Sequence, residues 1–292
     1  MRLSDLCRAR SFRYPAEYLF KRKQLQRVCL MARLDTQYWD SVQSLLGQGQ
    51  NPIWREHSDA INSAFVLRSL IHRKVGRALK TDLFDEVVGP GLYPLLEGVA
   101  EYVVGIDMSA QAAKRAQDSC RTLASAAADV RRLPFKSEAF DLIVSNSTLD
   151  HFEHFREVED SLRELRRVLK PGAQLILTLD NFANPTVALR NVLPAAFRRR
   201  SRIVPYFVGA TCGPARLRKV LASTGFEVHA LEAILHVPRF LAIHAAYFFG
   251  HYASGKLHHR ILRGMNGFEV MSRWPTKFLT AYYIGASAVR LQ

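Results

Sequence analysis

The chain has 292 residues, enough for one large or two small domains, each with a hydrophobic core. Its 48% hydrophobic and 23% charged residues are typical of a globular protein and exclude a disordered or collagen-like chain. The four cysteines lie far apart and form no CxxC pair, which argues against a structural zinc site and a redox disulfide. We therefore expect free thiols and no metal.

The net charge of +15 is unevenly distributed along the chain. The basic residues are concentrated in residues 1–75 and 181–292, whereas residues 76–180 are slightly acidic. Such flanks can contact nucleic acid, anionic lipid headgroups or an acidic small substrate, or they can simply be solvated. Basic residues also interrupt the apolar stretch that a signal peptide would need near the N-terminus, so we expect a cytoplasmic protein.

Residues 1–75 have apolar positions at helical spacing and are predicted to form an N-terminal helical cap of two or three helices. From about Val75, short apolar runs alternate with helices, which is typical of a parallel sheet covered on both faces. Residues 76–292 are predicted to form this α/β domain, with its core at 76–180. The predicted strands are Ala78–Phe84, Tyr102–Ile106, Phe140–Ser145, Gln174–Leu179, Phe226–Leu231 and Phe278–Val289.

Helix boundaries are predicted from capping residues. Ser109 is a candidate N-cap, and a second helix is expected at Glu157–Leu169. Pro214 suits a first helical turn, and Gly225 suits the C-terminal end of the same helix. Between the last two strands lies an insertion at about residues 234–276, rich in histidine, arginine and aromatic residues. An insertion of that length in a compact domain usually has a functional or covering role.

Four segments in fixed order carry the strongest signal. They are Val103–Ser109, Asp129 with Leu133–Phe135, Phe140–Val144, and Leu162–Leu169 followed by Lys170-Pro171-Gly172. This ordered set resembles the class I S-adenosylmethionine-dependent methyltransferases, especially those acting on small molecules and lipids. The resemblance covers residues 76–180 well and the flanks weakly. It implies a Rossmann-like fold with a mostly parallel seven-stranded sheet, helices on both faces, and S-adenosyl-L-methionine as cofactor.

The expected cofactor contacts follow the strand ends. Asp107, followed by Met108, ends the second strand, where a carboxylate is placed to accept hydrogen bonds from ribose hydroxyls. The resemblance implies that Asp129 receives the exocyclic amine of adenine, with the Val130 backbone beside it. Asn146 would line the floor where methionine and the acceptor meet. The alternatives are an N-cap for Asp107, a solvated loop acid for Asp129 and strand-end capping for Asn146.

The first glycine motif departs from the family, which normally has an acid followed by three alternating glycines after the first strand. Two registers are compatible with the sequence. In one, Gly89 and Gly91 form the tight turn beside the cofactor, preceded by Asp85 or Glu86. In the other, the strand ends at Thr81-Asp82, Asp82 and Glu86 face the methionine end, and the glycines lie in a later loop.

Methyl transfer is an in-line displacement, so the enzyme mainly needs to orient a nucleophile and exclude water. His151, helped by Asp150, follows the predicted strand Phe140–Ser145 and is our candidate general base. A positioning role is the alternative. In the insertion, basic and aromatic residues are candidates to bind an anionic or membrane-borne acceptor, or else form solvated helical faces. These basic candidates are Arg239, His251, Lys256, His258, His259, Arg260 and Arg263.

The sequence therefore predicts methyl transfer to oxygen or nitrogen of a small-molecule or lipid-like acceptor, with a possible peripheral membrane contact through the insertion. Methylation of RNA is the first alternative. It is disfavoured for base amino groups because Ser145–Thr148 lacks the Asn/Asp-Pro-Pro-aromatic motif of similar enzymes. The second alternative is a non-catalytic binding module, which the altered glycine motif would suit.

Overall fold

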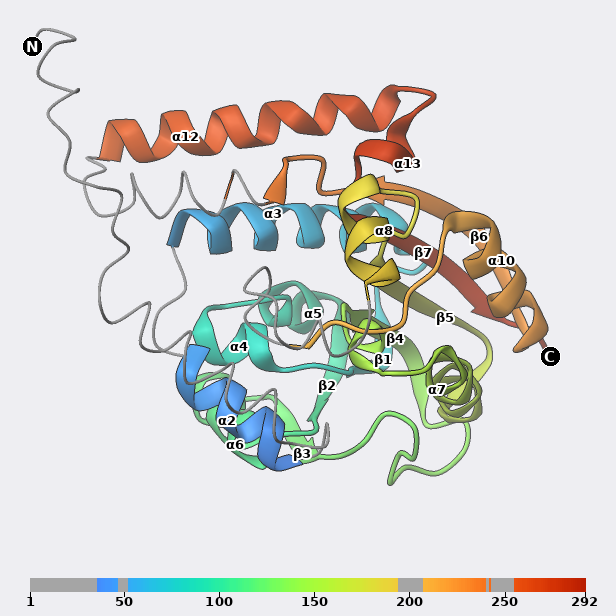
Figure 1. The fold of residues 1–292 in the computed structure, drawn as a ribbon. Helices are drawn as coiled ribbons and strands as arrows, with labels where there is room; N and C mark the ends of the chain where they lie inside the picture. The colour runs from blue at the N-terminus through green and yellow to red at the C-terminus, as the bar shows by residue number, and fades with distance from the viewer. Residues whose placement is uncertain (1–35, 47–51, 194–206, 240–241, 243–254) are drawn as a thin grey trace, which may run out of the picture.

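The computed structural model describes residues 36–46, 52–193, 207–239, 242 and 255–292, which form one sheet covered by helices (Figure 1). The sheet has seven strands in the order β3-β2-β1-β4-β5-β7-β6. The first five strands in this order run parallel, and β7 runs antiparallel between β5 and β6. The strands are β1 Val75–Lys80, β2 Ala100–Asp107, β3 Ala124–Ala127, β4 Phe140–Asn146, β5 Leu169–Asp180, β6 Phe226–Ile234 and β7 Tyr283–Arg290. The predicted mostly parallel seven-stranded sheet is confirmed.

Helices cover both faces of this sheet, because successive side chains of the buried strands point to opposite faces and need cover on each. One core contains side chains of α3, α5, α6 and α12, and the other contains side chains of α7 and α10. Neighbouring residues such as Ala78 and Leu79 of β1 belong to different cores. The helices of these two layers are α3 Pro52–Ser69, α5 Tyr93–Val99, α6 Ala110–Ser119, α7 Phe155–Val168, α10 Pro214–Ser223 and α12 Gly255–Gly267.

The remaining helices are short or pack on the outside of the helices already described. α2 packs against α6, and α12 lies along α3, as Figure 1 shows. None of the described helices is both long enough and apolar enough to cross a bilayer. These further helices are α2 Thr36–Leu46, α4 Phe84–Val88, η2 Leu149–His151, α8 Pro185–Val192, η3 Phe268–Arg273 and α13 Lys277–Thr280.

The predicted helix ends are confirmed where a side chain or glycine defines them. The Ser109 hydroxyl caps α6 by accepting from the Ala112 N–H at 3.0 Å. Pro214 is the first residue of α10. Gly225 follows this helix with φ of +87°, a conformation that glycine adopts without steric cost.

Several predicted strand ends are wrong: β1 begins at Val75 instead of Ala78, and β5 begins at Leu169 instead of Gln174. The first strand stops at Lys80 instead of Phe84, because the Asp82 carboxylate accepts from the Phe84 N–H at 2.9 Å and the chain turns into α4. The last strand begins at Tyr283 instead of Phe278, because Lys277–Thr280 forms the short helix α13. The short strand β3 was not predicted, since its four small residues have little apolar signal.

A buried ion pair lies at the turn between β1 and α4. Lys80 and Glu86 are both fully buried, and the Lys80 Nζ lies 2.7 Å from Glu86 Oε2. The other oxygen of Glu86 accepts from the Leu92 N–H at 2.9 Å. Lys80 also donates to the Asp82 carbonyl. The pair therefore ties the end of β1 to α4 and to the segment that follows this helix.

Removing one member of this pair should be far more damaging than removing both. We expect Lys80→Met to lower the free energy of unfolding by about 3–5 kcal/mol, because Glu86 is then a buried charge without its partner. The double variant Lys80→Met/Glu86→Gln should regain most of this loss, since the neutral amide that replaces the carboxylate can still accept from the Leu92 N–H. Urea denaturation followed by circular dichroism measures both. Equal losses in the single and double variants would show that the pair does not compensate the two charges.

Candidate functional site

A cavity of about 370 Å³ opens at the carboxyl ends of β1, β2 and β4. This is where ligands bind in open α/β sheets, since the loops that follow parallel strands meet at one edge. The loops after β1, β2, β3 and β4 form its floor, while α2 and α3 contribute Trp39, Trp54 and Arg55. Arg239 and Tyr283 complete the wall on the side of β7.

Two carboxylates from the ends of β1 and β2 point to this cavity. Asp82 accepts from the Phe84 N–H, and Asp107 accepts from the N–H groups of Leu83 at 3.1 Å and Ser109 at 2.8 Å. Burial raises the pKa of both carboxyl groups, and repulsion from Asp107 raises the pKa of Asp82 further. Among the described residues, no lysine or arginine forms an ion pair with either carboxylate. The arrangement therefore favours a cationic ligand.

An arginine from α3 lies next to these acids. Arg55 pairs with Asp85 and with Asp59, each at 2.5 Å. Burial alone would raise the pKa of Asp85, but Arg55 and Lys80 hold it below its ordinary value. The Asn146 amide also lies 3.4 Å from Asp85. These contacts attach α3 to α4 and place a guanidinium at the cavity.

The predicted contacts at Glu86, Gly89 and Gly91 lie outside the residues that line the cavity. Glu86 turns inward to Lys80, and both glycines follow α4 instead of the first strand. Gly91 has φ of +54°, and a Cβ there would collide with the Glu86 carboxylate. The register with a tight turn at Gly89 and Gly91 is thus wrong, and of the other register only Asp82 reaches the cavity.

The side of the cavity near β2 and β3 is more apolar. Met108, Ala128 and Val130 line it, as the sequence predicts for Met108 and Val130. Asp129 lies outside the lining residues, and its carboxylate pairs with Arg131, whose Nη2 lies 2.6 Å away. The predicted contact of the Asp129 carboxylate with adenine stays a prediction.

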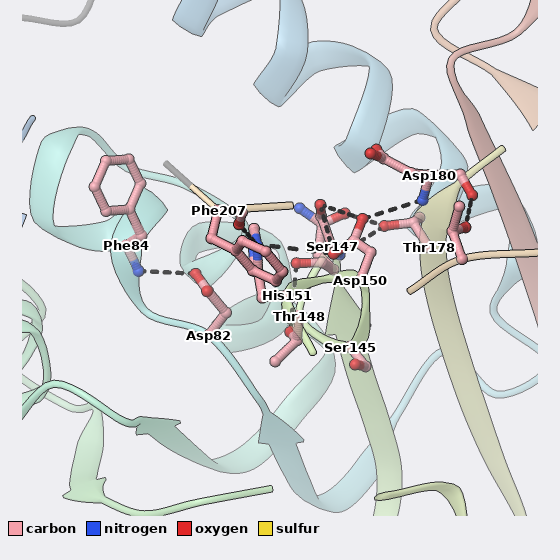
Figure 2. A network of polar contacts seen from close by, with 12 residues as sticks. Asp82, Phe84, Ser145, Ser147, Thr148, Asp150, His151, Thr178, Asp180 and Phe207 are labelled. Atoms are coloured by element: carbon pink, nitrogen blue, oxygen red, sulfur yellow. Dashed lines mark hydrogen bonds and ion pairs between the residues drawn. The ribbon is translucent and has the colours of Figure 1, made fainter. Parts of the chain in front are cut away.

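His151 lies on η2 and is one of the residues that line the cavity. Figure 2 shows it next to Phe207. Its Nδ1 lies 3.0 Å from the Phe207 carbonyl, which can only accept, so in the neutral ring Nδ1 carries the proton and Nε2 the lone pair. The ring also contacts Trp39, with centroids 4.9 Å apart. An imidazole held in this tautomer can accept a proton at Nε2.

Asp150 is fully buried and does not line the cavity. Its carboxylate accepts from the Ser147 hydroxyl and from the Asp180 N–H, both at 3.0 Å, as Figure 2 shows. Burial, and then the charge of Asp180, raise its pKa. Since Asp150 Oδ1 is 4.0 Å from His151 Nε2, Asp150 is placed to position the loop after β4 more than to share a proton with His151.

The C-terminal candidates separate into two groups. Arg239 lies at the cavity, with its guanidinium over the rings of Trp54 and Tyr282 and its NH1 3.3 Å from the Tyr283 hydroxyl. The other described candidates lie outside the lining residues, on α12. They are Lys256, His259, Arg260 and Arg263, which are exposed, and His258, which pairs with Glu56. His251 lies outside the described residues.

The cavity residues from α2 and α3 were not predicted. Trp39, Trp54 and Arg55 belong to helices whose apolar spacing indicates packing but not what they cover. The available signal was that two of the three tryptophans of the chain lie within these helices. Among the described residues, no group of three or more histidine, cysteine, aspartate or glutamate side chains is arranged to hold a metal ion.

Part of the chain matches a known protein family. Residues 88–177 match the model of a family described as a methyltransferase domain. A demethylmenaquinone methyltransferase of Streptomyces griseus is 27% identical over 148 residues, which cover 51% of this chain and 57% of that protein. A ubiquinone/menaquinone biosynthesis C-methyltransferase of Pseudomonas fluorescens is 27% identical over 151 residues, covering 52% and 56%. The chain thus spans less than two thirds of the length of these relatives.

Solved structures share the fold at low sequence identity. The geranyl diphosphate C-methyltransferase of Streptomyces coelicolor has a TM-score of 0.54 and 12% identity, covering 91% of this chain and 87% of that one. The cyclase SpnF has a TM-score of 0.55 and 18% identity, covering 84% of each chain. Because one neighbour is named a cyclase, the shared fold does not decide the reaction. Residues 88–177 thus match a methyltransferase-domain family, and the chain shares its fold with solved structures that include a methyltransferase.

Proposed function

We propose that the chain transfers the methyl group of S-adenosyl-L-methionine to a small-molecule acceptor. The observation that supports this most directly is the pair of cavity-facing carboxylates, Asp82 and Asp107, each with a raised pKa. A ligand with a sulfonium and an ammonium group would compensate their charge. The curated relatives named as methyltransferases support the same reaction class.

The rest of the cavity suits the other parts of this cofactor. Asp107 would receive the ribose hydroxyls, and Met108, Ala128 and Val130 would contact the adenine ring. Arg55 would bind the carboxylate of the methionine portion. When bound, the cofactor supplies an electrophilic methyl group, and the chain supplies orientation and a cavity partly closed by Trp39 and Trp54.

His151 is the candidate base. Its Nε2 can take the proton that an acceptor hydroxyl, amine or acidic carbon loses as the new bond to the methyl group forms. The Phe207 carbonyl and the Trp39 ring hold the imidazole, so little reorientation is needed. The predicted transfer to oxygen or nitrogen stays a prediction, since one relative is named a C-methyltransferase.

The acceptor we favour is a flat molecule with an acidic group. Arg239 presents a guanidinium among the rings of Trp54, Tyr282 and Tyr283, and such a group binds anions while its neighbours bind ring faces. Ser58 and Asn62 on α3 add polar contacts on the same lining. The quinone-related names of two relatives are consistent with a ring-shaped acceptor.

A non-catalytic module is the second candidate, and one observation favours it. Where the family has an acid followed by alternating glycines after the first strand, this chain has Asp82 followed by the helix Phe84–Val88, and Gly89 and Gly91 come only after that helix. Phe84 lines the cavity. Cofactor binding and methyl transfer must therefore be measured separately.

Neutralising either carboxylate should weaken cofactor binding and, for Asp82, stabilise the free protein. We expect Asp82→Asn and Asp107→Asn to raise the Kd for S-adenosylmethionine about tenfold or more in calorimetric titration. Because the pKa of Asp82 is raised in the native state, that state holds a proton on this carboxyl at pH values where the unfolded chain has lost it. The contribution of Asp82 to stability therefore falls as the pH rises from the unfolded-state pKa to the native-state pKa. Asp82→Asn should therefore unfold at higher urea concentration than wild type at neutral pH, and not at acid pH.

The control is Asp160→Asn, a half-exposed carboxylate on α7, which should change neither quantity. The affinity of wild type should increase as the pH rises and Asp82 ionises. Absence of binding to wild type would contradict the proposed function and favour the non-catalytic module. Unchanged affinity in both carboxylate variants would contradict the proposed binding mode alone.

Removing the base should affect turnover without affecting cofactor binding. We expect His151→Ala to slow methyl transfer about a hundredfold or more while the Kd for S-adenosylhomocysteine stays within about a factor of two of wild type. Radiolabelled methyl transfer to metabolite and lipid extracts, with total RNA as the alternative acceptor, measures the rate. His154→Ala, at a second cavity histidine, is the matched control. Turnover of His151→Ala at the wild-type rate would remove His151 from the mechanism, and labelling of RNA alone would replace the small-molecule acceptor.

A further inference from the structure

Exposed apolar side chains lie on three neighbouring elements at one end of the molecule. On α8, Leu189 and Val192 are 65% and 67% exposed, while Val187 and Arg190 on its other face are buried. On η3 and α13, and on the segment between them, Val270, Trp274 and Leu279 are about half exposed. Single exposed apolar residues are ordinary, but several on adjacent elements mark an interaction surface.

These elements are joined to one another. The Asn184 amide that begins α8 donates to the Thr280 carbonyl of α13 at 3.1 Å. Figure 1 shows α8 beside α13, and α13 near the end of α12. We call the exposed residues Leu189, Val192, Val270, Trp274 and Leu279 the apolar rim.

Basic residues accompany the apolar rim. Lys256, Arg260 and Arg263 are exposed on α12, and their spacing of four and three residues places them on one face of the helix. Arg273 on η3 and Lys277 on α13 continue the positive charge. The only acid between residues 255 and 280 is Glu269, which accepts from the His236 N–H. The charge complements an anionic surface.

We infer that the apolar rim and the basic face of α12 dock this protein on an anionic phospholipid bilayer. Side chains of this mixture insert into the headgroup boundary, where tryptophan and aliphatic groups leave water while lysine and arginine remain among phosphates. RNA would use the same charges, but it offers no comparable partner for leucine and valine, since bases stack on aromatic and guanidinium groups instead. The aliphatic members of the rim therefore favour the bilayer.

The apolar rim lies close to one wall of the cavity. Tyr283 lines the cavity and begins β7, shortly after α13. On the inner face of α8, Arg190 donates to the Tyr282 hydroxyl at 3.1 Å. The docked face thus adjoins the cavity wall at Arg239 and Tyr283, so an acceptor dissolved in the membrane could enter there. This consequence rests on the proposed function, whereas docking itself does not.

Vesicle sedimentation tests the docking. The wild-type chain should bind vesicles of phosphatidylcholine mixed with phosphatidylglycerol, and its binding to phosphatidylcholine alone should be weaker. We expect Arg260→Glu/Arg263→Glu to lower the partition coefficient about tenfold or more, and high salt to act in the same direction. Trp274→Ser should lower it by a similar factor in a way that salt does not mimic.

Matched controls lie elsewhere on the surface. Lys114→Glu/Arg115→Glu on α6 carries the same change of net charge, and Tyr102→Ser on β2 removes an exposed aromatic ring. Both should bind vesicles like wild type, and all four variants should keep the wild-type affinity for S-adenosylmethionine. The inference is overturned if wild type does not bind anionic vesicles, if the control pair loses binding equally, or if total RNA displaces the vesicles and Trp274→Ser has no effect. Since sedimentation needs no cofactor, failure of the proposed methyl transfer would leave this result unchanged.

Discussion

The contact between the Lys80 ammonium and the Glu86 carboxylate is the constraint on which the site depends. It lies where β1 ends, and it compensates two charges that the sheet and α4 exclude from water. Glu86 is occupied in this way, and Asp82 and Asp107 are the cavity-lining acids that follow β1 and end β2. A pair that holds the strand end also determines which carboxylates are left for a ligand.

Helix α4, which follows β1, is held by two further contacts. Arg55 of α3 reaches Asp85, and Asn146 at the end of β4 reaches the same carboxylate. On the opposite side, Asp150 joins the loop after β4 to β5 through the Asp180 N–H. Charged and amide groups thus connect the strand ends and preorganise the floor of the cavity. The side chains that cover this floor come from α2 and α3.

The sequence predicts a residue's position at the cavity well when that residue ends a strand or lies shortly after it. Asp107 and Asn146 end β2 and β4, Met108 and His151 lie in the segments that come next, and all four line the cavity. The prediction failed where a side chain pairs with a neighbour in its own turn or loop: the acidic spacing after β1 does not reveal that Glu86 turns to Lys80. Asp129 likewise has the expected position but is bound by Arg131. No local pattern shows that α3 covers the cavity, because helical periodicity identifies a buried face and not its neighbour.

The ring of Phe65 on α3 occupies the space above Gly285 of β7, where a Cβ would collide with it. Helix α3 is therefore part of the same hydrophobic core as the sheet, although it precedes the first strand in the chain. A shortened protein beginning at β1 would expose the glycine face of β7 to water as well as lose Trp54 and Arg55 from the cavity. The smallest unit that folds by itself should thus include α3. Replacing α3 by the corresponding helix of a relative would change the packing of the core as well as the residues that meet the acceptor.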